Sequence, residues 1–125
     1  MVLIFGGAYQ GKLEFAKENF NVTDEDIFGC TQENEIDWSK KVLCDMDQAF
    51  LRHVREGKES REVLAEHLKE LEEKILIIND ISQGIVPMER ELRDWREMTG
   101  RAMLYLSKEA DEVYRVFCGL GSKIK

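Results

Sequence analysis

The chain has 125 residues, of which 43% are hydrophobic and 34% are charged, so we expect residues 1–125 to form a single domain with one core. Its net charge of −7 argues against nucleic acid or an anionic membrane surface as the main partner, because phosphate-rich polymers repel an acidic protein. No apolar stretch is long enough to cross a bilayer, and the apolar N-terminal run lacks the basic lead of a signal peptide, so we expect a cytoplasmic protein without a membrane partner.

A glycine-rich segment follows the first predicted strand, residues 2–5, and reads GGAYQGK. It matches the phosphate-binding pattern G-x-x-x-x-G-K-[ST] at Gly6, Gly11 and Lys12, but Leu13 stands where the pattern has Ser or Thr. Glycines permit a tight ring whose N–H groups point at phosphate oxygens, at the positive end of the following helix. The segment therefore predicts a phosphate-binding loop; the alternative is a strand-to-helix turn with a surface lysine.

This loop supplies the predicted nucleotide site. The predicted nucleotide-binding residues are Gly6, Gly7, Ala8, Tyr9, Gln10, Gly11, Lys12 and Leu13. The expected ligand is ATP or GTP with Mg²⁺, and Lys12 is the predicted catalytic cation that reaches the terminal phosphates. Leucine cannot replace the hydroxyl that normally ligates Mg²⁺, so the sequence places the use of this metal in question.

Two further strands are predicted at residues 26–30 and 41–44, and the second ends at Asp45. Asp45 is the predicted acidic partner of the metal or of water and is counted among the catalytic residues, since ligands bind such sheets at the carboxyl ends of the strands. An equally open interpretation is that Asp45 caps the next helix. Asp47 is a weaker substitute for it.

The segment from residue 61 to 73 predicts a charge-rich helix with Leu64, Leu68 and Leu71 on one face, which is most simply scaffolding. The apolar run at residues 74–78 predicts a strand that is covered on both faces. Asp80 follows its end and is the second predicted metal ligand.

Pro87 predicts the start of the longest helix, which extends to about residue 108. Its apolar spacing places Trp95 and the methionines in a core or an interface rather than against a cofactor. Residues 112–118 predict the last strand. Gly119, Gly121 and Lys123 follow it and either approach the nucleotide from the side or form a plain C-terminal turn.

Cysteine and histidine provide no obvious chemistry. Cys30, Cys44 and Cys118 are widely spaced and odd in number, so buried reduced thiols are expected rather than a metal site or a disulfide framework. His53 and His67 lie on predicted helices, where surface or cap histidines are expected.

Several segments resemble the bifunctional adenosylcobinamide kinase and adenosylcobinamide-phosphate guanylyltransferase family of cobalamin biosynthesis. The resemblance is carried by Gly6-Gly7-Ala8 and Gly11-Lys12, by Asn79-Asp80-Ile81-Ser82-Gln83-Gly84-Ile85-Val86-Pro87, by Arg90, Arg93-Asp94 and Gly100-Arg101, by Ala110-Asp111-Glu112-Val113, and by the tail from Gly119 to Lys125. It covers about the first 13 and the last 47 residues. A G-x-V-P before a long helix, followed by this G-x-G-x-K-x-K tail, is fairly specific.

The resemblance implies an α/β protein with a P-loop nucleotide-binding fold, namely three α/β/α layers around a mostly parallel sheet of about five strands. It implies transfer of a terminal phosphoryl group to the hydroxyl of adenosylcobinamide, a corrinoid, then guanylyl transfer through a histidine, in a homo-oligomer. This chain is shorter in the middle, and its residues 31–38 contain no histidine, so we expect the guanylyltransferase activity to be absent.

Three functional hypotheses follow. The first is an adenosylcobinamide-kinase-like enzyme. The second is a nucleotide-binding or phosphate-binding protein without catalysis, such as a regulator. The third is a structural protein that uses the helix face around Trp95 as an oligomer interface.

Overall fold

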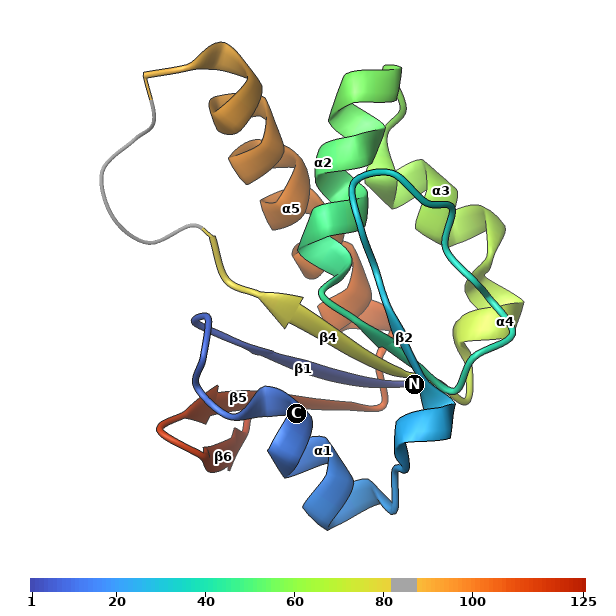
Figure 1. Ribbon diagram of the computed structural model, residues 1–125, viewed down its shortest axis with the longest axis vertical. Helices are drawn as coiled ribbons and strands as arrows, with labels where there is room; N and C mark the ends of the chain where they lie inside the picture. The colour runs from blue at the N-terminus through green and yellow to red at the C-terminus, as the bar shows by residue number, and fades with distance from the viewer. Residues whose placement is uncertain (82–87) are drawn as a thin grey trace.

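The computed structural model describes residues 1–81 and 88–125 (Figure 1). Its elements in chain order are β1 (Val2–Gly6), α1 (Lys12–Phe20), a 3-10 turn (Asp24–Asp26), β2 (Ile27–Gly29), β3 (Val42–Cys44), α2 (Met46–Glu56), α3 (Ser60–Glu66), α4 (Leu68–Leu71), β4 (Ile75–Asn79), α5 (Arg90–Glu109), β5 (Glu112–Phe117) and β6 (Leu120–Lys123). The predicted α/β class is confirmed.

Within the described residues, six strands form one sheet in the order β2-β3-β4-β1-β5-β6. All neighbouring pairs are parallel except β5 and β6, which form an antiparallel hairpin. The sheet is therefore mostly parallel, as predicted. β1 is paired on both sides, with β4 and with β5.

Helices cover both faces of this sheet, which gives the predicted three layers (Figure 1). Alternate residues of each buried strand point to opposite faces, so Leu3 and Ile4 of β1 enter different apolar clusters. The larger cluster joins the sheet to α2, α3, α4 and α5, and includes Phe50 and Leu106. The smaller one joins it to α1 through Phe15. No helix in the described part of the chain has the length and apolar character needed to cross a membrane.

Some predicted elements differ from the observed ones. The charge-rich helix is divided at His67 into α3 and α4. The C-terminal tail forms β6 rather than a plain turn, so the sheet has one strand more than the predicted five or so. α5 begins at Arg90, and Pro87, the predicted start, lies outside the described residues.

The cysteines and histidines also differ in part from the predictions. Cys30 and Cys44 are buried free thiols as predicted, but Cys118 is exposed because it lies in the β5–β6 turn. The prediction of a surface or cap histidine is wrong for His53, which is 1% exposed beneath the α2–α3 connection. His67 lies at the α3–α4 junction and stacks on Trp38, with ring centroids 3.9 Å apart.

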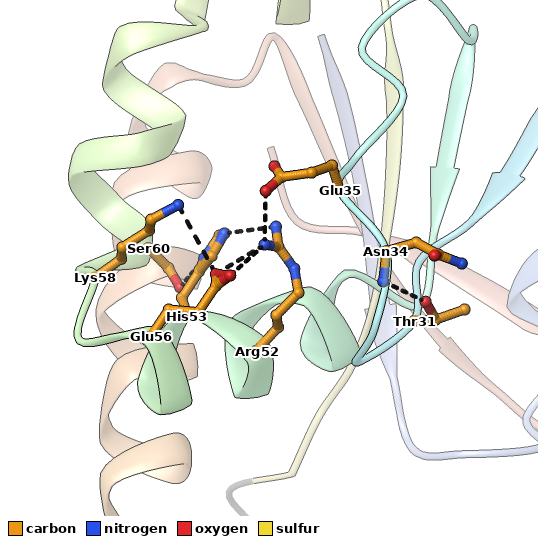
Figure 2. A network of polar contacts seen from close by, with 8 residues as sticks. All are labelled: Thr31, Asn34, Glu35, Arg52, His53, Glu56, Lys58 and Ser60. Carbon is orange, nitrogen blue, oxygen red and sulfur yellow. Dashed lines mark hydrogen bonds and ion pairs between the residues drawn. The ribbon is translucent and has the colours of Figure 1, made fainter.

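A polar network surrounds His53 (Figure 2). Its Nδ1 is 2.8 Å from Ser60 Oγ, and its Nε2 is 3.5 Å from an N–H group of Arg52. The Arg52 guanidinium donates to Glu35 and Glu56. Because the guanidinium has only donors, Nε2 accepts and Nδ1 carries the proton that is donated to Ser60. Burial, followed by the charge of Arg52, lowers the pKa of His53 to about 4.

This pKa predicts that acid weakens the fold. An unfolded histidine titrates near 6.5, so between pH 6.5 and 4 the unfolded chain binds a proton that the folded chain does not. The contribution of His53 to the free energy of unfolding should fall by about 3 kcal/mol as the pH falls through this window. Urea denaturation at several pH values should show that the free energy of unfolding depends less on pH in His53→Gln than in the unchanged chain. Equal dependences would contradict this account.

Candidate functional site

The predicted phosphate loop is a tight connection between β1 and α1, at the carboxyl edge of the sheet. Gly6 has no room for a side chain, because a Cβ there would lie 2.4 Å from the Val116 carbonyl oxygen. Gly11 has a φ of 87°, precedes the first residue of α1, and accepts the N–H of Phe15 at 3.0 Å. The glycines of the pattern are therefore required by close packing and by a left-handed backbone.

Tyr9 and Lys12 of this loop differ in exposure. Tyr9 has a φ of 61° and is fully exposed. The Lys12 side chain is buried and its Nζ donates to the Gly7 carbonyl at 2.6 Å. Burial lowers the pKa of Lys12, and the negative charges of Asp45 and Asp47 act in the opposite direction. Lys12 is thus a buried cation enclosed by its own loop.

Leu13 begins the first turn of α1 together with Lys12 and packs partly against the smaller apolar cluster. It also lines the pocket beside the loop. A hydrocarbon side chain at this place supplies no oxygen to a cation, so any metal ligand here must come from another residue.

Asp45 and Asp47 stand at the start of α2, directly after β3. Asp45 occupies the N-cap position with a φ of 54°, but its side chain makes no capping hydrogen bond. Asp45 therefore stands at the N-cap position, as the alternative interpretation predicts, but its carboxylate accepts from Asn79 and caps no N–H of α2. Asp47 is 1% exposed, and burial is the largest influence on its carboxyl group and raises its pKa.

Asn79 connects these two carboxylates. It is the last residue of β4 and pairs in register with Gly6 of β1. Its Nδ2 donates to Asp45 Oδ1 and to Asp47 Oδ1, both at 3.0 Å, and its backbone N–H donates to the same Asp47 oxygen. Because both side-chain donors are engaged, the orientation of the Asn79 amide is fixed. We call Asp45, Asp47 and Asn79 the carboxylate bracket.

Trp95 of α5 lines the same space. Its Nε1 donates to the Asp47 carbonyl at 2.7 Å. Its ring is half-buried and packs against the larger apolar cluster, in line with a core position, but it also lines the candidate site, where the sequence predicted no ligand contact.

The loop, the carboxylate bracket and Trp95 line one pocket of about 590 Å³. The lining residues are Ala8, Tyr9, Gln10, Gly11, Lys12, Leu13, Glu14, Cys44, Asp45, Asp47, Gln48, Ile77, Asn79, Ile81 and Trp95. This volume is in the range of pockets that hold small molecules and cofactors. The structure therefore brings most of the predicted site residues into one space, including Lys12 and Asp45.

Asp80 lies apart from this pocket. Its N–H donates to the Gly6 carbonyl at 2.8 Å, and it borders a second cavity of about 290 Å³ along α5 with Thr99 and Met103. Lys123 is also separate, since its Nζ is 3.2 Å from Glu112. Asn79 and Trp95 were not predicted as site residues; the polar residue at the end of the predicted strand 74–78 was a signal that was not used for Asn79.

Comparison with known proteins gives the family. The family model described as cobinamide kinase / cobinamide phosphate guanyltransferase matches residues 34–124. The chain belongs to this family. The matched range contains the carboxylate bracket and Trp95, whereas the loop at residues 6–12 precedes it.

Two curated relatives agree with this result. The chain is 43% identical over 51 residues to the bifunctional adenosylcobalamin biosynthesis protein CobU of Salmonella typhimurium. It is 41% identical over 51 residues to the protein of the same name from Escherichia coli. Each match covers 41% of this chain and 28% of the relative. The resemblance noted in the sequence is confirmed at the level of the family.

We predict that the carboxylate bracket depends on the Asn79 amide. Asn79→Asp exchanges two N–H donors for a third carboxylate, so it should lower the free energy of unfolding at pH 7 by about 3 kcal/mol or more. Protonation relieves the repulsion, so stability relative to the unchanged chain should recover as the pH falls toward 4. Urea denaturation would measure both effects, with exposed Asn34→Asp as the control, because the hydrogen bond of Asn34 to Thr31 uses its backbone N–H. Full stability of Asn79→Asp at pH 7 would contradict this account.

Proposed function

We propose that this chain binds a nucleoside triphosphate in the loop pocket and transfers its terminal phosphoryl group to the hydroxyl of an adenosylcobinamide-type corrinoid. The observation that carries the proposal is the buried Lys12 within a glycine loop, at the N-terminus of α1, in a chain of this family. Backbone N–H groups and the helix dipole favour an anion there, and Lys12 would neutralise the charge of the terminal phosphates.

The pocket residues fit a nucleotide that brings its own Mg²⁺. The loop has no hydroxyl at Leu13, but Asp45 supplies a carboxylate, and the Asn79 amide supplies a further oxygen, both ligand types that Mg²⁺ accepts. The carboxylates of Glu14, Asp45 and Asp47 would repel a bound phosphate group. A bound metal cation would reduce this repulsion. Asp80 borders the neighbouring cavity along α5, so among the two predicted metal ligands we favour Asp45.

The transfer itself requires mainly positioning. The acceptor oxygen forms a bond to the terminal phosphorus, the bond from that phosphorus to the bridging oxygen breaks, and the nucleoside diphosphate leaves. The hydroxyl proton passes to a carboxylate such as that of Asp45 or to water. In this arrangement Lys12 holds the phosphoryl oxygens, and Trp95 helps to limit the access of water.

We infer that the chain does not carry out guanylyl transfer through a histidine. The sequence contains two histidines. His53 is buried with both ring nitrogens facing Ser60 and Arg52, and His67 is stacked on Trp38 and bonded to Glu70. Neither residue borders the loop pocket.

A second candidate function is nucleotide binding without catalysis. Leu13 favours this candidate, because the hydroxyl that normally orients the metal is missing. The loss of one electrostatic contact commonly raises the activation barrier by several kcal/mol. Such a protein would bind ATP or GTP with no turnover of cobinamide. Oligomerisation of the chain stays a prediction.

Lys12→Met tests the binding step. Removal of the buried cation should weaken binding of ATP and GTP by about tenfold or more, because the charge-assisted contacts to phosphate are lost. Isothermal titration calorimetry with Mg²⁺ would measure this change. Lys17→Met on the exposed side of α1 is the matched control and should bind as the unchanged chain does. Binding that is absent in the unchanged chain, or equal in Lys12→Met, would refute the proposal.

Leu13→Ser tests the missing hydroxyl. Restoring this oxygen should raise affinity for ATP by about tenfold in the presence of Mg²⁺ and leave affinity in EDTA unchanged. The comparison with and without metal removes any effect of the lost apolar packing. A product assay with adenosylcobinamide on the same proteins separates the kinase from the non-catalytic alternative. An equal affinity gain with and without Mg²⁺ would contradict the role assigned to Leu13.

A further inference from the structure

The C-terminal hairpin lies against the phosphate loop, although more than a hundred residues separate them in the chain. β5 and β6 are joined by Cys118 and Gly119, which have φ angles of 50° and 77°, and Phe117 pairs with Leu120. Positive φ at both central residues is the signature of a two-residue hairpin turn that matches the twist of its strands. The turn therefore has a defined backbone conformation.

Both N–H groups of this turn donate to Gln10. The Cys118 N–H donates to Gln10 Oε1 at 2.7 Å, and the Gly119 N–H donates to the Gln10 carbonyl oxygen at 2.8 Å. One loop residue thus satisfies two neighbouring donors of the hairpin, one through its side chain and one through its backbone.

Close packing of glycines accompanies these two hydrogen bonds. A Cβ on Gly11 would lie 3.2 Å from Gly119 Cα, and a Cβ on Gly121 would lie 2.1 Å from the Phe15 ring. Gly121 is therefore explained by its contact with Phe15 of α1, whereas Gly119 is explained by its φ of 77° in the turn, since a Cβ there would meet nothing within 4 Å. The tail borders the loop from behind rather than lining the pocket.

The hydrogen bond to the Gln10 carbonyl fixes the direction of the Gly11 N–H. The C=O of Gln10 and the N–H of Gly11 belong to one planar trans peptide, so they point in opposite directions. Because the C=O points at the hairpin, the Gly11 N–H points away from it. In a phosphate loop, the direction of such N–H groups determines how well an anion is held.

We propose that Gln10 is a positioning residue that uses the β5–β6 turn to orient the backbone of the phosphate loop. This inference rests on the proposed function of the loop. Gln10 acts on the ligand through the Gly11 peptide, and its side chain holds the turn in place. The consequence is that a change at Gln10 alters affinity for any ligand with a polyphosphate, whatever its base.

Gln10→Met keeps the length of the side chain and removes the Oε1 acceptor. It should weaken binding of both inorganic tripolyphosphate and MgATP by about three- to tenfold, as expected for the loss of one hydrogen bond. The amide of Cys118 should exchange its hydrogen faster in Gln10→Met, and keep its protection in Gln10→Glu, which retains an acceptor oxygen. Thr31→Val, which removes a side-chain acceptor of the Asn34 N–H away from the pocket, is the control and should keep both affinities.

Equal affinities of Gln10→Met and the unchanged chain would overturn the inference and leave the proposed function intact. If the unchanged chain binds neither tripolyphosphate nor MgATP, the proposed function fails and the inference fails with it. A measurement on the unchanged chain covers the case in which Gln10→Met does not fold. The amides of Cys118 and Gly119 should gain protection when tripolyphosphate binds, and the absence of any gain would overturn the inference.

Discussion

The parallel pairing of β1 with β4 and β5 is the constraint on which the site depends. It places Gly6 beside Asn79 on one side, and it brings the Val116 backbone against Gly6 on the other. The phosphate loop, the carboxylate bracket and the hairpin turn then meet at one edge of the sheet, because parallel strands end on the same side. A shift of one residue in this pairing would turn the side chains of β1 to the opposite face of the sheet and separate these groups.

The electrostatics of the pocket are unusual for an anion site. Lys12 is its buried cation, while Glu14, Asp45 and Asp47 bring carboxylates to the same space. The amide of Asn79 holds two of these carboxylates in place without neutralising them. Under the proposed function, the phosphate group arrives with a divalent cation, so that each charge has a partner. In that proposal Asp45 and Asn79 offer the metal the oxygens that Leu13 lacks.

Much of the fold could be predicted from local patterns. Continuous apolar runs at β1 and β4 predicted buried strands, and the glycines around Lys12 predicted the loop, because these features depend on a few neighbouring residues. Asp45 was predicted because it follows a strand. The tail was harder to predict, since its strand β6 forms only by pairing with β5. The division at His67 was missed because the leucine spacing continues across it.

Contacts between distant segments could not be predicted in this way. The burial of His53 depends on Ser60 and Arg52, and the role of Asn79 depends on the register of β4 with β1. The contact of Gln10 with the hairpin joins residues at opposite ends of the sequence. These interactions require the folded arrangement, and they are also the ones that distinguish this chain from a general glycine-rich loop.

The central claim is that residues 6–13 form a phosphate-binding loop. Titration of an isotope-labelled chain with inorganic tripolyphosphate and Mg²⁺, followed by backbone amide NMR, tests it most directly. The account predicts saturable shifts that are largest at Gly7, Ala8, Gly11, Lys12 and Leu13, with smaller shifts at Asp45 and Asn79. No shifts, or shifts concentrated around Trp38 and His67 instead, would contradict it.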